Sequence, residues 1–233
     1  MENYKKNLDL LTKNYVYSKE MEHDACGVGL IASTEGKKSR TIVEHGIEAL
    51  KAVWHRGAVD ADGKTGDGAG IHLEIPKDFF IEKIEVTGHD YDDAEICVGM
   101  IFLPRNDYAA QESCKTIVES ELTKNNFSIY GWRQVPVNSK VLGNKALQTM
   151  PEIIQVLFKS NDTNLLDKKL ERKIYETRKR IENKAFDASL NNFYICSFSS
   201  KSIIYKGLYL AEAISDFYLD LKDSRFISRY AIF

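Results

Sequence analysis

The hydrophobic and polar positions along the chain follow two periods, and the helical period is clearest at residues 41–54. Apolar residues there recur every three or four positions and form one stripe, which consists of Val43, Ile47, Leu50 and Trp54. This spacing predicts an amphipathic helix that ends near Gly57. Thr41 and Glu44 have the spacing of a capping box, so we expect them to satisfy the free amides at its start.

Two further helices are predicted at residues 108–124 and 164–185. The second is the most regular, and its apolar stripe consists of Leu166, Leu170, Ile174 and Ile181. Glu176 and Arg180 lie one turn apart, and we expect them to pair on its exposed side.

Short apolar runs between these helices predict strands. They occupy residues 26–33, 71–75, 96–103, 127–135, 153–158, 193–198, 203–205 and 226–233. The runs on either side of residues 199–202 are predicted to form a hairpin, and the Gly- and Asp-rich residues 55–70 a loop. Because strands come in runs rather than in strict alternation with helices, the pattern favours an α+β fold of antiparallel sheets covered by helices.

Composition limits the classes of function. The 233 residues are 43% hydrophobic and 28% charged, which is the balance of a soluble globular protein. A formal net charge of −2 argues against non-specific electrostatic binding to nucleic acid or to an anionic membrane. No apolar run approaches the roughly 20 residues of a membrane span, and the polar start lacks the apolar stretch of a secretory signal. We therefore expect a cytoplasmic protein without nucleic-acid or membrane partners.

The four cysteines, at positions 26, 97, 114 and 196, form no CxxC pair. Neither a disulfide framework nor a zinc site is expected from this spacing, and no metal ligands are predicted. Cys97, Cys114 and Cys196 fall inside predicted strands or helices, where a lone cysteine is typically a small buried hydrophobic residue. Cys26 differs, because it stands between the charged residues 1–25 and an apolar run.

Cys26 is the candidate nucleophile, and a cysteine nucleophile needs a base or a lowered pKa. A histidine is one possible base, and the chain has His23, His45, His55, His72 and His89. Another is the α-amino group of Cys26 itself, with a reference pKa of about 7.7–8.0, which becomes available only if residues 1–25 are removed. The residues alone leave both sources open.

Several blocks, taken together and in order, resemble the start of the glutamate synthase large subunit. They are His23-Asp-Ala-Cys-Gly-Val-Gly-Leu-Ile31, Trp54-His-Arg-Gly-Ala58, Thr65-Gly-Asp-Gly-Ala-Gly-Ile71, Asn192-Phe-Tyr-Ile-Cys-Ser-Phe-Ser-Ser200 and Ile204-Tyr-Lys-Gly-Leu208. The resemblance spans residues 15–233. The glycines of 66–70 lack the Gly-Lys-Ser/Thr ending of a phosphate-binding loop, and we interpret them as a turn.

The resemblance implies an N-terminal nucleophile hydrolase fold, an αββα sandwich of mainly antiparallel sheets. It implies that residues 1–25 are a propeptide and that residues 26–233 form a glutamine amidotransferase type-2 domain. Cys26 would attack the carboxamide of glutamine with its own α-amino group as base, releasing ammonia and forming a thioester. Arg56 and Gly27 are expected to support the substrate pocket.

In the complete enzyme of this family, the ammonia meets 2-oxoglutarate in a distant domain and yields glutamate. FMN, an iron–sulfur cluster and a reduced electron donor serve that second step, and no site for them is expected in this chain. The implied partners are glutamine as substrate, the remaining domains of glutamate synthase and its small subunit.

In relatives, a sequence like that of residues 230–233 is followed by the glutamine-recognition motifs. We therefore expect a partial domain with an exposed apolar edge at its last strand, and little glutaminase activity from the isolated chain. Two alternatives remain: an N-terminal nucleophile hydrolase acting on another amide, and a non-catalytic fragment that binds a partner chain.

Overall fold

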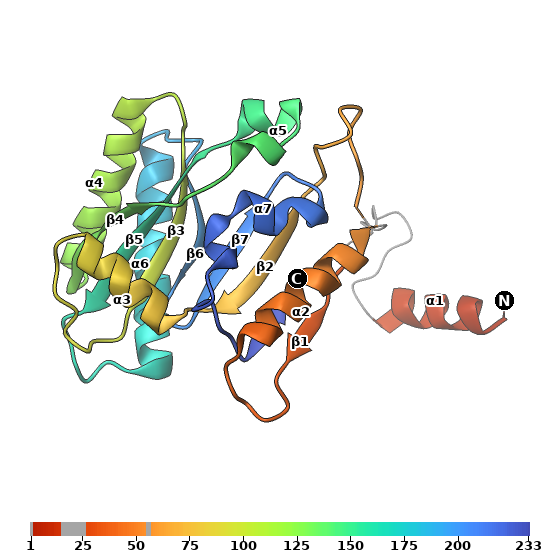
Figure 1. The fold of residues 1–233 in the computed structure, drawn as a ribbon, viewed down its shortest axis with the longest axis horizontal. Coiled ribbons are helices and arrows are strands. Elements are labelled where there is room, and N and C mark those ends of the chain that lie inside the picture. The colour runs from red at the N-terminus through yellow and green to blue at the C-terminus, as the bar shows by residue number, and fades with distance from the viewer. Residues whose placement is uncertain (1, 15–26, 55–56) are drawn as a thin grey trace.

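The computed structural model describes residues 2–14, 27–54 and 57–233, and it contains two four-stranded sheets (Figure 1). Sheet I has the strand order β1-β8-β2-β7, and sheet II the order β4-β5-β3-β6. All strand pairs within them are antiparallel. The strands are β1 (Leu30–Ala32), β2 (Ala69–Glu74), β3 (Cys97–Leu103), β4 (Phe127–Gln134), β5 (Glu152–Ser160), β6 (Tyr194–Ser199), β7 (Ser202–Gly207) and β8 (Tyr230–Ile232).

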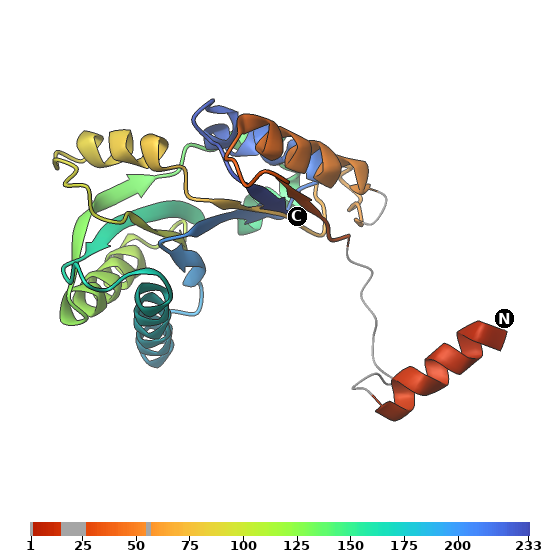
Figure 2. The same ribbon diagram turned by 90° about the horizontal axis from the view of Figure 1, so that it is seen from below.

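Helices lie on both sides of the sheets. The α-helices are α1 (Glu2–Asn14), α2 (Arg40–Ala52), α3 (Lys77–Val86), α4 (Tyr108–Lys124), α5 (Asn144–Thr149), α6 (Asp167–Asp187) and α7 (Ile214–Phe217). Short 3₁₀ turns form η2 (Ser139–Val141), η3 (Ala211–Ala213) and η4 (Leu219–Lys222). Seen from below, α4 and α6 cover one side of the strands while α2 and α3 cover the other (Figure 2). This arrangement confirms the predicted α+β class.

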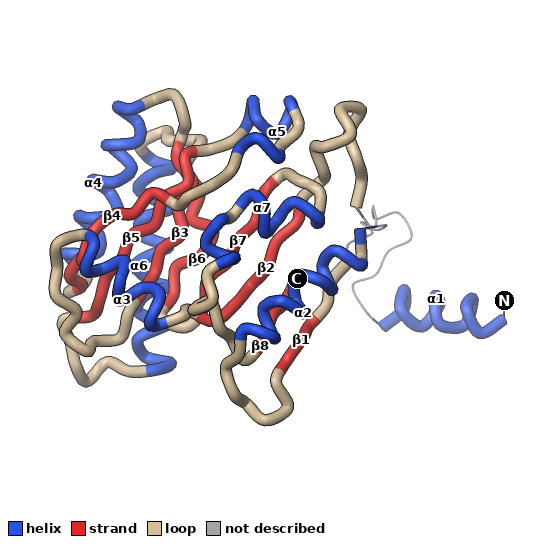
Figure 3. Tube along the Cα trace, viewed as in Figure 1, coloured by secondary structure: helices blue, strands red, loops and turns tan. Residues whose placement is uncertain are grey.

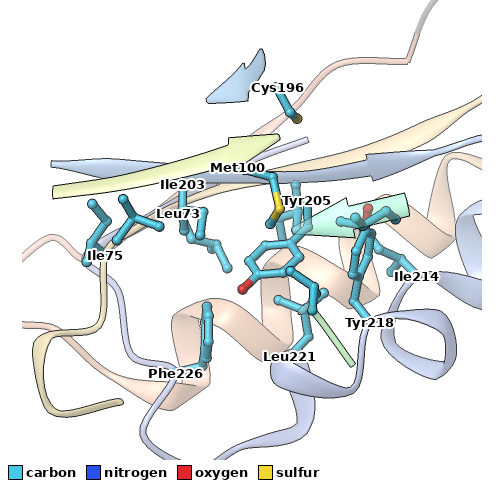
Figure 4. Close-up of a cluster of buried hydrophobic side chains, with 14 of the residues drawn as sticks. Leu73, Ile75, Met100, Cys196, Ile203, Tyr205, Ile214, Tyr218, Leu221 and Phe226 are labelled. Atoms are coloured by element: carbon cyan, nitrogen blue, oxygen red, sulfur yellow. The ribbon is translucent and has the colours of Figure 1, made fainter. Parts of the chain in front are cut away.

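Two apolar cores hold these layers together. One joins α4 and α6 to sheet II, and its buried members include Ile101, Cys114, Val118, Phe158, Ile174 and Ile181. The other lies where the two sheets meet, with Met100 of sheet II and Tyr205 of sheet I among its fully buried side chains (Figure 4). Fully burying one such side chain stabilises the fold by about 1.5–3 kcal/mol.

The first and last strands of the body are neighbours. Leu30 of β1 pairs with Ile232 of β8, and β8 also pairs with β2 through His72 and Leu73 (Figure 3). The expectation that the last strand leaves an exposed edge is therefore wrong, because β8 has a partner on each side. Strand β1 is one of the two edges of sheet I, and its Leu30 is exposed. Within the run predicted as a buried strand, the strand that forms is thus the short edge strand Leu30–Ala32.

The helix predicted at residues 41–54 is confirmed as α2, but its cap differs. Ser39 is the N-cap, and its Oγ accepts a hydrogen bond from the amide of Ile42 at 3.3 Å. Glu44 instead pairs with Arg40 at 3.0 Å. The capping-box interpretation of Thr41 is wrong because the N-cap, Ser39, lies two residues earlier than that spacing indicated.

The helix predicted at residues 164–185 is confirmed as α6, whose apolar stripe is buried except at the exposed N-cap residue Leu166. The predicted pairing of Glu176 with Arg180 is wrong. Glu176 accepts a hydrogen bond at 2.9 Å from Nε of Arg172, one turn earlier on the same exposed side. Both pairings satisfy the one-turn spacing, so the spacing cannot choose between them.

The predicted hairpin at residues 193–205 is also wrong. Its two strands exist as β6 and β7, but β6 belongs to sheet II and β7 to sheet I. The turn between them carries the chain from one sheet to the other. Local apolar pattern shows that two strands follow each other and not which partners they take.

Candidate active site

A cleft of about 550 Å³ opens beside Gly27, the first described residue after position 26. Its walls come from the end of α2, the loop before β2, and the segment after β7. The lining residues are Gly27, Leu50, Val53, Trp54, Gly57, Val59, Gly63, Asp67, Gly68, Ala69, Tyr209, Leu210, Ala211 and Glu212. Segments far apart in the sequence thus converge at the predicted site.

Of the predicted site residues, the structure describes only Gly27, and this glycine lines the cleft. Cys26 and Arg56 lie outside the described residues. The residues that follow them in the chain, Gly27 and Gly57, both line the cleft. The roles of Cys26 and Arg56 stay predictions.

The position of Gly27 is fixed through the start of β1. The amide of Gly29 donates to the carbonyl of Phe233 at 2.8 Å, and the amide of Phe233 donates back to Gly29 at 3.0 Å. This pair continues the β1–β8 ladder by one residue beyond Leu30. The backbone at Gly27 is therefore only two residues from a hydrogen-bonded ladder.

The loop at the cleft is itself ordered as a small hairpin. Val59 and Gly66 form an isolated antiparallel bridge, and the amide of Asp60 donates to the carbonyl of Thr65 at 2.9 Å. We call residues 58–67 the cleft hairpin. Gly66 lies against the backbone of Tyr209, where an added Cβ would sit 2.5 Å from the carbonyl oxygen, so this glycine permits a close contact between two cleft walls.

The interpretation of the glycines at residues 66–70 as a turn is only partly confirmed. Gly68 has a positive φ of 125° and lines the cleft, whereas Gly70 belongs to strand β2 and lies against Lys206 and Tyr205 of the neighbouring strand.

The charged side chains that line the described part of the cleft, Asp67 and Glu212, are both acidic. None of the three described histidines, His45, His72 and His89, is among the lining residues. His72 lies in β2 with its ring edge-on to Tyr230, and burial lowers its pKa. Among the described residues, therefore, no imidazole is placed to act as base in this cleft.

The remaining three cysteines are confirmed as buried, unpaired residues. Burial raises the pKa of Cys114 and of Cys196 to about 11, and raises that of Cys97 well above its usual value. Because the thiolate is the reactive form, these three thiols are unreactive at neutral pH. Within the described part of the chain, no group of side chains has the composition of a metal site.

Residues 26–233 match the family of class-II glutamine amidotransferases. The chain belongs to this family. The matched region begins at the candidate nucleophile, and the paired antiparallel sheets with flanking helices agree with the fold of the family.

The chain is similar to several glutamate synthases. It is 52% identical to the large chain of the NADPH enzyme from Azospirillum brasilense over 230 residues, covering 99% of this chain and 15% of that protein. It is 38% identical to ferredoxin-dependent glutamate synthase 2 from Synechocystis sp. and 39% identical to ferredoxin-dependent glutamate synthase 1 from Arabidopsis thaliana. Each of these two matches covers 91% of this chain and 13% of the relative. The chain thus spans about one seventh of the length of these relatives.

Among the residues that the structure describes, no helix combines the length and the apolar character required to cross a membrane.

Proposed function

We propose that this chain is the glutamine-hydrolysing domain of a glutamate synthase, with Cys26 as its nucleophile once residues 1–25 are removed. The observation that carries the proposal is the cleft beside Gly27, at the position where the family match begins. A nucleophile at the mouth of a cleft can reach a bound substrate, whereas the three buried cysteines cannot.

The proton transfers can be carried by the groups of residue 26 alone. Its α-amino group takes the proton of the thiol, and the thiolate attacks the carboxamide carbon of glutamine. The resulting ammonium group gives its proton to the amide nitrogen, the carbon–nitrogen bond breaks, and ammonia leaves with a γ-glutamyl thioester remaining. Water then attacks the thioester, the amine again carries the proton, and glutamate and the free thiol are restored.

The cleft supplies part of what an amino-acid substrate requires. Asp67 and Glu212, which are both exposed at the cleft, suit the α-ammonium group of glutamine because opposite charges attract. Arg56, next to the lining residue Gly57, is proposed to support the pocket from the same wall. In the proposed parent enzyme the ammonia serves glutamate synthesis from 2-oxoglutarate, with FMN, an iron–sulfur cluster and a reduced donor acting in other domains or in a small subunit.

Mass spectrometry and thiol labelling of the purified chain test this proposal. We expect a mature chain that begins at Cys26, and a Cys26→Ala variant that keeps residues 1–25. We also expect iodoacetamide at neutral pH to label Cys26 first. High concentrations of glutamine, but not of asparagine, should slow that labelling, because Asp67 and Glu212 line the cleft although the recognition motifs of the family are expected after residue 233. The buried Cys97, Cys114 and Cys196 act as internal controls, since their raised pKa values keep them protonated.

An unprocessed chain whose Cys26 reacts like a free cysteine, and is not protected by glutamine, would contradict the proposal and favour a non-catalytic binding fragment. Protection by a different amide would instead indicate another N-terminal nucleophile hydrolase.

A further inference from the structure

The cleft hairpin has a second side, which faces helix α5 rather than the cleft (Figure 3). Residues 144–149 of α5 are more than seventy positions further along the sequence, yet the hairpin tip contacts the first turn of this helix. The contact is built from Asp62 and Thr65.

Asp62 organises the hairpin tip. Its Oδ1 accepts hydrogen bonds from the amides of Lys64 at 2.9 Å and Thr65 at 2.7 Å, and its Oδ2 accepts one from Oγ1 of Thr65 at 2.6 Å. These hydrogen bonds, the one from the Thr65 hydroxyl above all, hold the pKa of Asp62 well below its usual range. The carboxylate is therefore ionised throughout the physiological pH range.

The same two side chains complete the start of α5, which has no side-chain cap of its own because Gly143 is its N-cap. The amide of Lys145 donates to Oδ2 of Asp62 at 3.4 Å, and the amide of Ala146 donates to Oγ1 of Thr65 at 3.3 Å. Free amides in the first turn of a helix need such partners.

The approach is so close that only glycine fits at position 143. An added Cβ there would lie 2.3 Å from both Oδ2 of Asp62 and Oγ1 of Thr65. Thr65 is also almost fully buried, with 4% of its surface exposed. Thr65 is thus packed against α5, while Asp62 is itself exposed and reaches α5 through the amide of Lys145.

Val59, Gly63 and Asp67 of the same hairpin line the cleft, and Gly66 rests against the backbone of Tyr209, which lines it as well. The hairpin is therefore held at its tip by α5 and near its base by the segment after β7. A displacement at the tip would move a cleft wall.

We infer that Asp62 is a positioning residue, which fixes the cleft hairpin against α5 and so sets the shape of the cleft that receives the amide substrate. This inference rests on the proposed function. Asp62 is not among the cleft-lining residues, and it acts through Val59, Gly63 and Asp67.

An ion pair at the same junction provides a matched control. Nζ of Lys145 lies 2.6 Å from Oδ2 of Asp60, but the lysine side chain is 71% exposed. Exposed pairs of this kind contribute little, because solvent screens the two charges. Lys145→Ala removes this pair and keeps the backbone amide that Asp62 accepts.

The experiment measures the glutamine concentration that halves the rate of Cys26 alkylation, in the wild-type chain and in Asp62→Ala, Asp62→Asn, Thr65→Val and Lys145→Ala. We expect that concentration to rise about tenfold or more in Asp62→Ala, because small displacements of a binding wall have large effects on recognition. Thr65→Val removes the hydroxyl that Asp62 binds and should show a similar rise. It replaces Asp62→Ala in the comparison if that variant does not fold. Asp62→Asn keeps one acceptor oxygen and should fall between Asp62→Ala and the wild type, while Lys145→Ala should stay within about twofold of the wild type.

Hydrogen exchange of residues 58–67, measured on the same samples, shows whether the hairpin has loosened. Faster exchange in Asp62→Ala with unchanged glutamine protection would mean that Asp62 only stabilises the hairpin, and the inference would be overturned while the proposed function stands. If glutamine does not protect Cys26 in the wild type, the proposed function fails and the inference fails with it.

Discussion

At the residue scale, Arg133 and Asp220 form a buried ion pair where the two sheets meet. Nη1 and Nη2 of Arg133 donate to the two carboxylate oxygens of Asp220 at 2.8 and 2.5 Å. Gln155 accepts from the same guanidinium at 2.7 Å, and the Tyr205 hydroxyl donates to Asp220 at 3.1 Å. The pair thus joins β4, β5, β7 and η4 in one network of satisfied polar groups.

We predict that Asp220→Ala lowers the free energy of unfolding by about 3–5 kcal/mol, because it leaves a buried guanidinium without its counter-ion. The control is Asp216→Ala, which removes the ion pair with Lys222, where both side chains are more than half exposed. That change should cost about 1 kcal/mol or less. Urea unfolding measures both, and equal losses in the two variants would contradict the prediction.

The sequence anticipated the residues whose role depends on local context and missed those whose role depends on distant partners. Cys97, Cys114 and Cys196 were predicted to be buried because each lies inside a predicted strand or helix. Nothing in the local sequence distinguishes Asp62 from an ordinary loop aspartate. Its contact with Lys145 joins residues 83 positions apart, and no local pattern carries that information.

At the element scale, α2 shows how a helix start depends on one hydroxyl. Besides capping the helix through its side chain, Ser39 exchanges backbone hydrogen bonds with Ser228 at 3.0 and 3.2 Å. The backbone contact survives any side-chain change, so the cap can be tested separately from it.

Ser39→Ala should lower the free energy of unfolding by about 1 kcal/mol, since the amide of Ile42 loses its acceptor. Thr41→Ala tests the cap that the sequence pattern proposed. Thr41 is exposed on the helix surface, and alanine is the better helix former, so stability should stay equal or rise by a few tenths of a kcal/mol. Thermal or urea unfolding of both variants measures these changes. A larger loss of unfolding free energy in Thr41→Ala than in Ser39→Ala would support the capping-box interpretation.

Helices α4 and α6 were predicted from the sequence, whereas α3 and α5 were not. The helix at residues 108–124 has the predicted bounds, because several turns of periodic apolar residues specify it. Helix α3 was not predicted, since Pro76 was taken only as the end of a strand although proline also suits a helix start. Helix α5 has six residues and takes its cap from Asp62 and Thr65, so its own sequence contains little signal.

At the scale of the whole molecule, Glu74 of β2 binds Arg229, the residue that precedes β8. Its carboxylate accepts hydrogen bonds from the backbone amide of Arg229 at 2.6 Å and from Nε of the same residue at 3.0 Å. Burial alone would raise the pKa of Glu74, but the bonds from Arg229 and the nearby Lys38 bring it below its usual value.

A depressed pKa in the folded chain means that this stabilisation is present above the pKa of the unfolded chain, about 4.3, and is lost as pH falls through the folded value. We therefore predict that Glu74→Gln is less stable than the wild type at pH 7, and that the difference shrinks as the pH approaches 3. Urea unfolding across this range measures it. Glu35→Gln is the control. The Glu35–Lys37 pair is exposed, so the stability difference between this variant and the wild type should stay small at every pH. A difference that grows in acid would contradict the prediction.

The fold class followed from the sequence, whereas the assignment of strands to sheets did not. Apolar runs that follow one another, together with the helical stripes, indicated antiparallel sheets covered by helices. The separation of β6 from β7, and the place of β8 between β1 and β2, arise from pairings between distant segments. Those pairings depend on packing of the whole chain, which a pattern of single residues does not encode.

The pairing of β1 with β8 has a consequence for the order of events during translation. All strands of sheet II lie within residues 97–199, so that sheet can form while synthesis continues. Sheet I must wait for residues 230–232. At roughly 5–20 residues per second, the ribosome needs on the order of ten to forty seconds to travel from one partner to the other. Strand β1, which begins four residues after position 26, therefore stays without its neighbour β8 until residues 230–232 have been synthesised.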